Sequence, residues 1–276
     1  MTIPPVRTLP PTCWARTPAE LWEVLRDDLE TCGVGLVQAS LRQWRLNRPD
    51  EDRLRRLLGR DLTRYQATDN ETVRERFAAS RALLRCAVGA AVGMAPEHVE
   101  IGYHLSGRPF VRGCDQVDIS LSHTAHLLFV GVTSLGRIGV DAESADRAPS
   151  VAELDRHICT PSELRAMDGI PPEGYEALVL QRWILKEAYS KALGQGLHFP
   201  FTEFGFEVRG GLARLCHKDG ARVEDPTWTF HNLPRTDGHQ AAVALQDLRA
   251  GHVGDTRVGT AVDLRTARAL WGDRTA

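Results

Sequence analysis

Apolar and polar positions along the chain predict groups of helices followed by groups of strands. A helix is expected from Thr17, because a threonine followed three residues later by Glu20 and then by apolar residues is a capping pattern. Gly33 ends this helix, and the segment GLVQASL after it predicts a strand. An arginine-rich amphipathic helix is expected within residues 45–66. A long helix is expected over residues 71–94, where Phe77, Leu84 and Val88 form one stripe.

The middle and the second half of the chain repeat this order of elements. VDISLS, LLFVGVT and RIGVDAE, within residues 117–143, have the lengths and patterns of half-buried or buried strands. Thr160, Pro161 and Glu163 then open a second helical stretch. A long helix is expected over residues 174–193, and four strands are expected within residues 202–246.

This order predicts an α+β protein with two lobes of similar size. The expected boundaries are a flexible arm over residues 1–17, an N-terminal lobe over 18–136, a C-terminal lobe over 137–250 and a tail over 251–276.

Composition narrows the class of protein. The 276 residues include 34 basic and 36 acidic side chains, a formal net charge of −2, which gives no argument for nucleic acid or a membrane as partner. The six cysteines are scattered without a CxxC pair, as in a reduced cytosolic protein. The most apolar run, residues 127–132, is far shorter than the roughly 20 residues that a membrane-spanning helix needs. The Pro-rich start does not resemble a signal peptide. A cytoplasmic monomer is expected.

Two acids in one predicted strand suggest a cation site. Asp141 and Glu143 are two residues apart, so their side chains point to the same face of the strand. Neighbouring carboxylates repel unless a cation lies between them, and Mg²⁺ prefers carboxylate, water and phosphate oxygens. Taken alone, such a pair is more often an exposed strand end.

Two further segments carry candidate chemistry that is weak when each is taken alone. Glu187 and Lys191 are four residues apart and share a helix face, which usually means a surface ion pair. Ser122 and His123 end a predicted strand and offer a hydroxyl and an imidazole to an anion. A serine hydrolase is disfavoured because the chain has no GxSxG elbow.

Together, four segments in this order resemble the signature of the larger, single-chain phosphopantetheinyl transferases. They are GRPFV, LSHT, GVDAE and WILKEAYSKALGQGL, and the resemblance covers roughly residues 45–245. The last two segments follow the family pattern almost fully. Arg108 replaces the usual lysine of the first segment, and Ile119 and Ser120 appear before Leu121 where the family has a Phe-Asn pair.

The resemblance implies transfer of the 4′-phosphopantetheine arm of coenzyme A to a serine of an acyl or peptidyl carrier protein, with release of adenosine 3′,5′-bisphosphate. It implies two similar lobes in a pseudo-twofold arrangement, with the active site between them. It also assigns roles: Asp141, Glu143 and Glu187 would bind Mg²⁺, Glu187 would take the proton of the serine, and Lys191 would contact the pyrophosphate. Glu163 would lie near the catalytic water.

The same resemblance implies a site for coenzyme A in the first half of the chain. Arg108, Ser122 and His123 match the positions that bind its 3′-phosphate, with Asp141 and Lys191 at the pyrophosphate. Arg76, Arg81 and Arg53 are further candidates for phosphate contacts. Since carrier proteins are acidic, the arginine-rich surface near residues 45–64, with Arg53 and Arg56, is a candidate for steering them.

Three alternatives remain open at this stage. The first is another Mg-dependent phosphotransferase or phosphodiesterase, although no Walker loop or kinase signature is present. The second is a non-catalytic relative that binds carrier proteins. The third, zinc chemistry, has no HExxH pattern to support it. Carriers of fatty-acid, polyketide, nonribosomal-peptide and siderophore synthesis all fit, with secondary metabolism as the expected setting.

Overall fold

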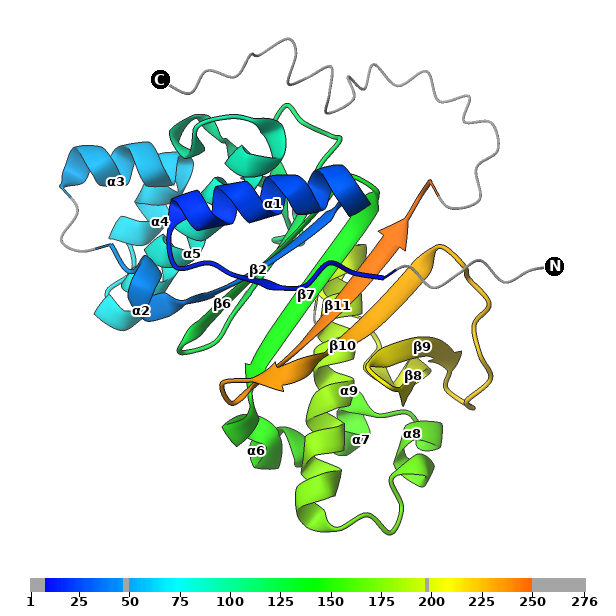
Figure 1. Cartoon of the computed structure of the whole chain (residues 1–276). Coiled ribbons are helices and arrows are strands. Elements are labelled where there is room, and N and C mark those ends of the chain that lie inside the picture. Colours follow the sequence, from blue (N-terminus) through cyan, green and yellow to red (C-terminus); the bar gives the residue numbers. More distant parts are fainter. Residues whose placement is uncertain (1–7, 47–49, 197–198, 250–276) are drawn as a thin grey trace. The chain divides into compact units, whose positions relative to one another are not determined.

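The computed structural model describes residues 8–46, 50–196 and 199–249 (Figure 1). The described chain divides into two compact units, an N-terminal unit from Leu9 to Gly136 and a C-terminal unit from Arg137 onward. Each contains helices and its own sheet, so the protein is a mixed α+β protein as the sequence predicts. Residues 1–7 of the predicted arm and the predicted tail 251–276 lie outside the described residues.

The N-terminal unit is built on a four-stranded sheet in the order β1-β2-β6-β5. β1 is parallel to β2, and the other neighbours are antiparallel. The strands are β1 (Cys13–Trp14), β2 (Val34–Ser40), β5 (Asp118–His123) and β6 (Leu127–Thr133), and a separate pair joins β3 (Ile101–Tyr103) to β4 (Pro109–Val111). Residues 13 and 14 of the predicted flexible arm therefore belong to the sheet, and Ala15 after them is fully buried.

Helices α1 (Pro18–Cys32) and α5 (Glu71–Val92) pack against each other and on this sheet. Figure 1 shows α1 running alongside β2. Thr17 caps α1 by accepting a hydrogen bond from the Glu20 backbone N–H, and Gly33 ends it in a left-handed conformation. Both ends are those that the sequence predicts. The unit also has five short elements. They are the helices α2 (Leu41–Trp44), α3 (Glu51–Leu58) and α4 (Leu62–Gln66) and the 3₁₀ turns η1 (Gly59–Asp61) and η2 (Pro96–His98).

The single helix expected within residues 45–66 is divided in the structure. Asp50 caps α3 by accepting a hydrogen bond from the backbone N–H of Arg53, and Gly59 ends the helix with a positive φ of 51°. The turn η1 and the helix α4 follow. The interruption at Gly59 turns the chain, so the arginines of residues 45–66 do not share one helix face.

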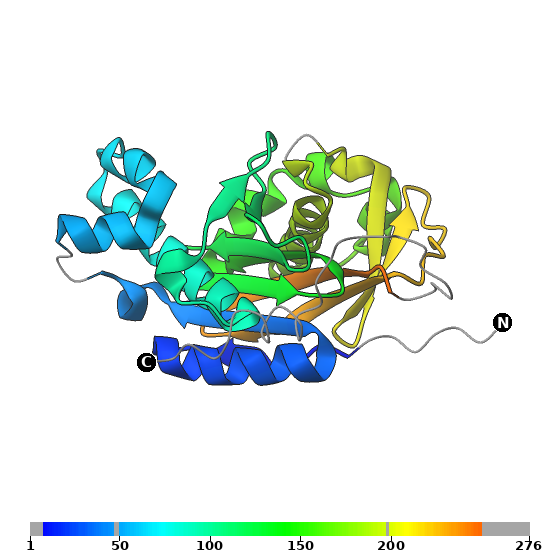
Figure 2. The same ribbon diagram turned by 90° about the horizontal axis from the view of Figure 1, so that it is seen from above.

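The C-terminal unit has a five-stranded sheet in the order β7-β11-β10-β9-β8. Its strands are β7 (Gly136–Ser144), β8 (Phe204–Arg209), β9 (Leu212–His217), β10 (Trp228–Thr236) and β11 (His239–Asp247). The long helix α9 (Pro172–Leu193) crosses one face of this sheet and contacts β8, β10 and β11 (Figures 1 and 2). The remaining elements are η3 (Ala145–Arg147), α6 (Ala148–Ala152), α7 (Asp155–Ile158), α8 (Pro161–Ala166) and η5 (Phe201–Glu203).

Aromatic side chains fill the space between α9 and the sheet of the C-terminal unit. Tyr189 of α9 makes edge-to-face contacts with a group of rings from the strands and from the loop after α9, namely Phe199, Phe204, Phe206, Trp228 and Phe230. Such contacts stabilise a fold beyond the area that they bury. These ring contacts fix the position of α9 relative to the strands of the sheet. None of the described helices is long and apolar enough to cross a membrane.

Candidate active site

A close approach of α9 to β7 brings the segments that carry Asp141 and Lys191 together. Gly139 of β7 lies against the backbone of α9, where a Cβ atom would collide with Ala188 O and lie 2.6 Å from Ala192 N. Only glycine permits this contact. Two residues further along β7, Asp141 accepts a hydrogen bond of 2.6 Å from Lys191 Nζ of α9. Asp141 is 5% exposed, so this ion pair is largely shielded from water.

Glu187 lies one helical turn before Lys191 and is 9% exposed. Its Oε1 atom is buried and accepts no hydrogen bond from the described part of the chain. Burial raises the pKa of Glu187 to about 7, and the carboxylates of Asp141 and Glu143 raise it too, while Lys191 opposes the shift. Asp141 and Glu143 therefore act electrostatically on Glu187.

Glu143 has its own cationic partner. Its Oε1 accepts hydrogen bonds of 2.7 Å from Arg147 and of 3.3 Å from Trp183 Nε1 of α9. Arg147 is half exposed, so this contact can exchange with solvent. Glu143 is thus tied both to the turn that follows β7 and to α9.

The arrangement of these acids shows how far the site suits a magnesium ion. Within residues 8–46, 50–196 and 199–249, no group of three or more His, Cys, Asp or Glu side chains is arranged as a metal site. Lys191 and Arg147 instead hold two of the three carboxylates. The donor set nevertheless fits, because carboxylate oxygens are the ligands that Mg²⁺ prefers. A bound cation would also give the buried Glu187 Oε1 atom the partner that it lacks among the described residues. The ligand set stays a prediction.

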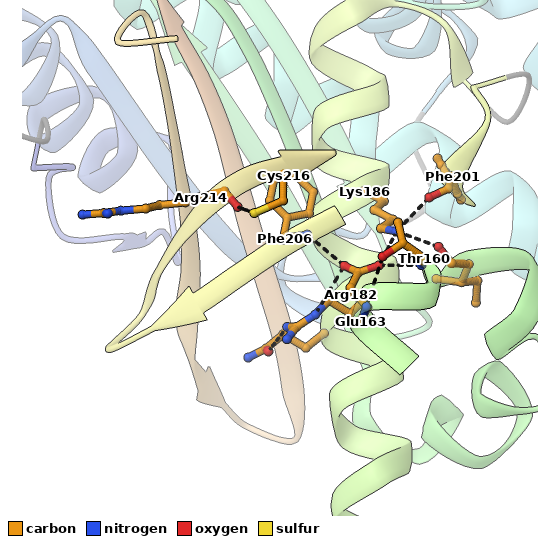
Figure 3. Close-up of polar contacts among 10 residues, drawn as sticks. Thr160, Glu163, Arg182, Lys186, Phe201, Phe206, Arg214 and Cys216 are labelled. Carbon is orange, nitrogen blue, oxygen red and sulfur yellow. Dashed lines mark hydrogen bonds and ion pairs between the residues drawn. The ribbon is translucent and has the colours of Figure 1, made fainter. Parts of the chain in front are cut away.

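Glu163, predicted to lie near the catalytic water, is part of a buried polar network (Figure 3). Its Oε2 accepts bonds from Thr160 N at 2.9 Å and Lys186 Nζ at 2.7 Å, and its Oε1 accepts one from Phe206 N at 2.9 Å. The Glu163 backbone N–H donates back to Thr160, which completes the predicted capping box. These contacts give Glu163 a role in folding, and none of them involves the acids of β7 or Glu187.

Lys186 is the centre of this network, and sequence reasoning assigned it no role. The side chain is fully buried and donates three bonds of 2.7 Å, to Glu163, Ile158 O and Phe201 O. Arg182, one turn earlier in α9, lies 3.5 Å from Glu163. The network joins α9 to α7, α8, η5 and β8. It therefore fixes the helix that carries Glu187, the residue next to Lys186.

The candidates for coenzyme A binding in the N-terminal unit are spread over several elements. Arg108 lies before β4 and forms a 2.5 Å ion pair with Asp118, the first residue of β5. Ser122 and His123 end β5; Ser122 is buried and His123 is exposed. Consecutive strand residues point to opposite faces, which explains this difference. Their place at the end of a strand is the one that the sequence predicts, and their role at a phosphate stays a prediction.

The arginines of α5 divide between the surface and the interior. Arg81 is 8% exposed, lies 3.4 Å from Asp61, and stacks over Phe77 and Tyr103 with its guanidinium carbon 4.7 and 5.3 Å from the ring centroids. Arg76 is half-buried. The guanidinium of Arg81 is therefore engaged inside the unit.

Two further arginines of the N-terminal unit differ in their exposure. Arg85, one turn after Arg81 in α5, is 4% exposed and donates to Val99 O and Leu58 O. It is a structural residue. Arg53 is exposed on α3.

Comparison with known proteins agrees with the chemistry of the C-terminal unit. Residues 137–244 match the family model of the 4′-phosphopantetheinyl transferase superfamily. The chain is 28% identical to 4′-phosphopantetheinyl transferase HetI of Nostoc sp. over 62% of this chain and 71% of the relative. It is 31% identical to a phosphopantetheinyl transferase of Thraustochytrium sp. over 64% and 65%, and 24% identical to 4′-phosphopantetheinyl transferase of Bacillus subtilis over 46% and 55%.

The candidate site residues of the C-terminal unit lie in the segment that matches the family model. Asp141, Glu143, Glu163, Glu187 and Lys191 all lie within the matched residues. The chain covers between about half and about seven tenths of these relatives. The motifs, the family model over residues 137–244 and these relatives are all similarities to the 4′-phosphopantetheinyl transferase superfamily.

Proposed function

We propose that this chain transfers the 4′-phosphopantetheine arm of coenzyme A to a serine of an apo acyl or peptidyl carrier protein, as an enzyme of the larger, single-chain type. The observation that carries the proposal is the junction of β7 and α9, where the Asp141–Lys191 ion pair lies beside the buried Glu187. Phosphoryl transfer relies on positioning and charge stabilisation more than on covalent chemistry. A fixed cluster of acids and one lysine suits that task.

Asp141, Glu143 and Glu187 would hold a magnesium ion, which supplies positive charge to the pyrophosphate of coenzyme A. Glu187 takes the proton from the serine hydroxyl as its oxygen attacks the phosphorus on the pantetheine side. The Glu187 carboxylate is a candidate for this base because it is buried at the junction and its Oε1 accepts no hydrogen bond from the described residues. The P–O bond to the nucleotide then breaks, and adenosine 3′,5′-bisphosphate leaves with the bonding electrons.

Lys191 has two partners in this scheme. It holds Asp141 at 2.6 Å and is a quarter exposed, so its ammonium group remains accessible to a ligand. It would stabilise the negative charge that grows on the leaving phosphate. Its position one turn after Glu187 puts the proton acceptor and the positive charge on the same face of α9.

For the nucleotide part of coenzyme A, we propose Arg108, Ser122 and His123, with Arg76, Arg81 and Arg53 as weaker contacts. Arg108 already forms an ion pair with Asp118. A bound phosphate would compete with Asp118 for the planar guanidinium, which binds carboxylates and phosphates in the same fork geometry. The exposed imidazole of His123 is open to solvent and can approach a ligand.

The test is a loading assay on intact protein. Apo carrier protein is incubated with coenzyme A, Mg²⁺ and the enzyme, and mass spectrometry follows the gain of one phosphopantetheine arm. Asp141→Ala and Glu187→Ala should abolish the gain without loss of folding, because both side chains belong to the polar site. Glu173→Ala, an exposed acid at the start of the same helix, is the matched control and should keep full turnover.

The outcomes separate this function from its alternatives. Near-normal turnover of either site variant would contradict the assignment of the acids. Binding of carrier protein without any gain in mass would indicate a non-catalytic relative. Cleavage of coenzyme A without a modified carrier would indicate another phosphodiesterase. A panel of apo carriers from fatty-acid, polyketide, nonribosomal-peptide and siderophore synthesis would then rank the substrates.

A further inference from the structure

The N-terminal unit contains an arginine-lined pocket that shares only Arg53 with the residues proposed for coenzyme A. The pocket is open to solvent and has a volume of about 630 Å³. The start of α1, the end of α2, helices α3 and α5, and the turn η2 contribute its walls. A pocket of this size is in the range that accepts a small organic molecule.

Positive charge dominates the rim of the pocket. Among the described lining residues, four are arginines and one is acidic: Arg16, Arg45, Arg53, Arg56 and Glu97. Arg45 forms an ion pair with Glu75. For the other three arginines, the described part of the chain contains no ion pair with an acid. The chain as a whole is nearly neutral, so this concentration of charge is local.

The arrangement of arginines follows from helix α3. Arg53 and Arg56 are three residues apart and therefore share one helix face, which lines the pocket. Arg55 lies on another face and bonds to Glu51 at 2.8 Å. In α3, Arg53 and Arg56 therefore face the pocket, whereas Arg55 pairs with Glu51 on another face.

The base of the pocket is apolar. Trp44, Leu57, Ala82 and Cys86 contribute to it, and Trp44 is held in place by a 3.0 Å bond from its Nε1 to Ala15 O. Burial, with the Glu97 carboxylate as a smaller cause, raises the pKa of the Cys86 thiol to about 12. Cys86 is therefore uncharged at neutral pH and serves as packing surface rather than as a nucleophile.

We propose that this pocket is a binding site for a small organic anion with an apolar or aromatic body, of the carboxylate or phosphate-monoester class. The guanidinium groups of Arg16, Arg53 and Arg56 bind the anionic head, because arginine presents two parallel donors to a carboxylate or phosphate. The side chains of Trp44 and Leu57 contact the body. Arg108, Ser122, His123, Arg76 and Arg81 do not belong to the described lining, so the site is distinct from most of the residues proposed for coenzyme A.

The test is direct binding to the full-length chain. The probe is 8-anilinonaphthalene-1-sulfonate, an aromatic anion that fluoresces in apolar surroundings. Saturable binding is expected, with displacement by decanoate and by decyl phosphate but not by uncharged decanol. The competition between decanoate and decyl phosphate shows which head group the arginines prefer.

Charge-reversal variants locate the site. The pair R53E/R56E should weaken probe binding by about tenfold or more, since it replaces two attractive charges with two repulsive ones. The charge-matched control R55E/R60E changes exposed arginines outside the lining and should change the affinity by about twofold or less. R16E is an independent variant on another element and should also weaken binding. Circular dichroism checks that each variant is folded.

Four results would overturn the proposal. They are absence of saturable binding, equal loss in both double variants, displacement by decanol as effective as that by decanoate, and stoichiometric displacement of the probe by coenzyme A. A raised KM for apo carrier protein in R53E/R56E, together with unchanged probe binding, would instead show a carrier-docking surface. The binding assay contains no carrier protein, so its outcome does not depend on the transfer reaction.

Discussion

Replacing Lys186 with methionine should destabilise the C-terminal unit strongly. The ammonium group is fully buried and donates three bonds of 2.7 Å, to Glu163, Ile158 O and Phe201 O. Methionine fills a similar volume but offers no donor. The variant therefore leaves the Glu163 carboxylate without its closest cation in an environment that water does not reach.

The magnitude follows from the burial of both partners. Glu163 is 5% exposed, and removal of one member of a buried ion pair typically costs about 3–5 kcal/mol. Thr160 N and Phe206 N still donate to Glu163, and Arg182 remains 3.5 Å away, which limits the loss. We expect a reduction of about 3–5 kcal/mol in the free energy of unfolding of the C-terminal unit.

The matched control is Lys218→Met. Lys218 pairs with Glu203 at 3.0 Å, but the two side chains are 60% and 56% exposed. Exposed pairs contribute about 0–1 kcal/mol, so the same chemical change should have little effect there. The double variant E163Q/K186M should recover part of the loss, because a glutamine leaves no buried charge without a counter-ion.

The assay must report on the C-terminal unit, because two units can unfold in separate transitions. Hydrogen exchange of peptides from α9, measured by mass spectrometry, gives the local free energy of opening, and guanidinium unfolding followed by circular dichroism gives the cooperative transition. A loss below about 1 kcal/mol in K186M, or an equal loss in the Lys218 control, would refute the reasoning. The buried network would then be a consequence of the fold rather than a cause of its stability.

Three further predictions concern the junction of β7 and α9. In metal-free buffer, burial raises the pKa of folded Glu187 from its ordinary value of 4.5 to about 7, so its contribution to stability is present below pH 4.5 and lost as pH rises through about 7. A Glu187→Gln variant should show a flatter stability profile over this range in denaturant titrations, and an unchanged profile would contradict the burial argument. Lys191→Met should lower kcat by about 10²–10³-fold while the Kd for coenzyme A changes far less. Single-turnover kinetics measures the chemical step and calorimetry measures the Kd. A change in Kd alone would contradict the role of Lys191 in the chemical step. Gly139→Val should destabilise the C-terminal unit, because the valine side chain would collide with the backbone of α9. Gly174→Ala should be tolerated, because its added methyl group meets only the side chain of Ile170. Thermal unfolding measures both variants, and equal melting temperatures would show that α9 can move away from β7.

The sequence was sufficient for the elements whose signals are local. Thr17 and Thr160 cap helices through hydrogen bonds to residues three positions later, so the information lies within one turn. Gly33 and Gly194 end helices with φ values of 74° and 75°, which few other residues adopt. The alternation of VDISLS likewise located β5, although Ser120 and Ser122 on its polar face are buried as well.

The sequence did not predict which charged residues pair with one another. Arg81 and Arg85 have the spacing of a solvated helix face, yet both are buried and are held by Asp61, Leu58 and Val99, which lie 14 to 27 positions away. Lys186 and Glu163 look like ordinary surface charges in the sequence but form a buried pair across 23 positions. Partners at such separations are chosen by the packing of elements, which no local pattern encodes.

The sequence by itself therefore determined the α+β class, most helix ends and the resemblance to the phosphopantetheinyl transferases, since the acids, the lysine and their order along the chain are written in it. Only the tertiary structure decided which of these charges meet. Gly139 lets α9 approach β7, and that contact joins Lys191 to Asp141 beside a buried Glu187. A side chain's charge is fixed by its type, but its solvation and its pKa depend on the elements packed around it.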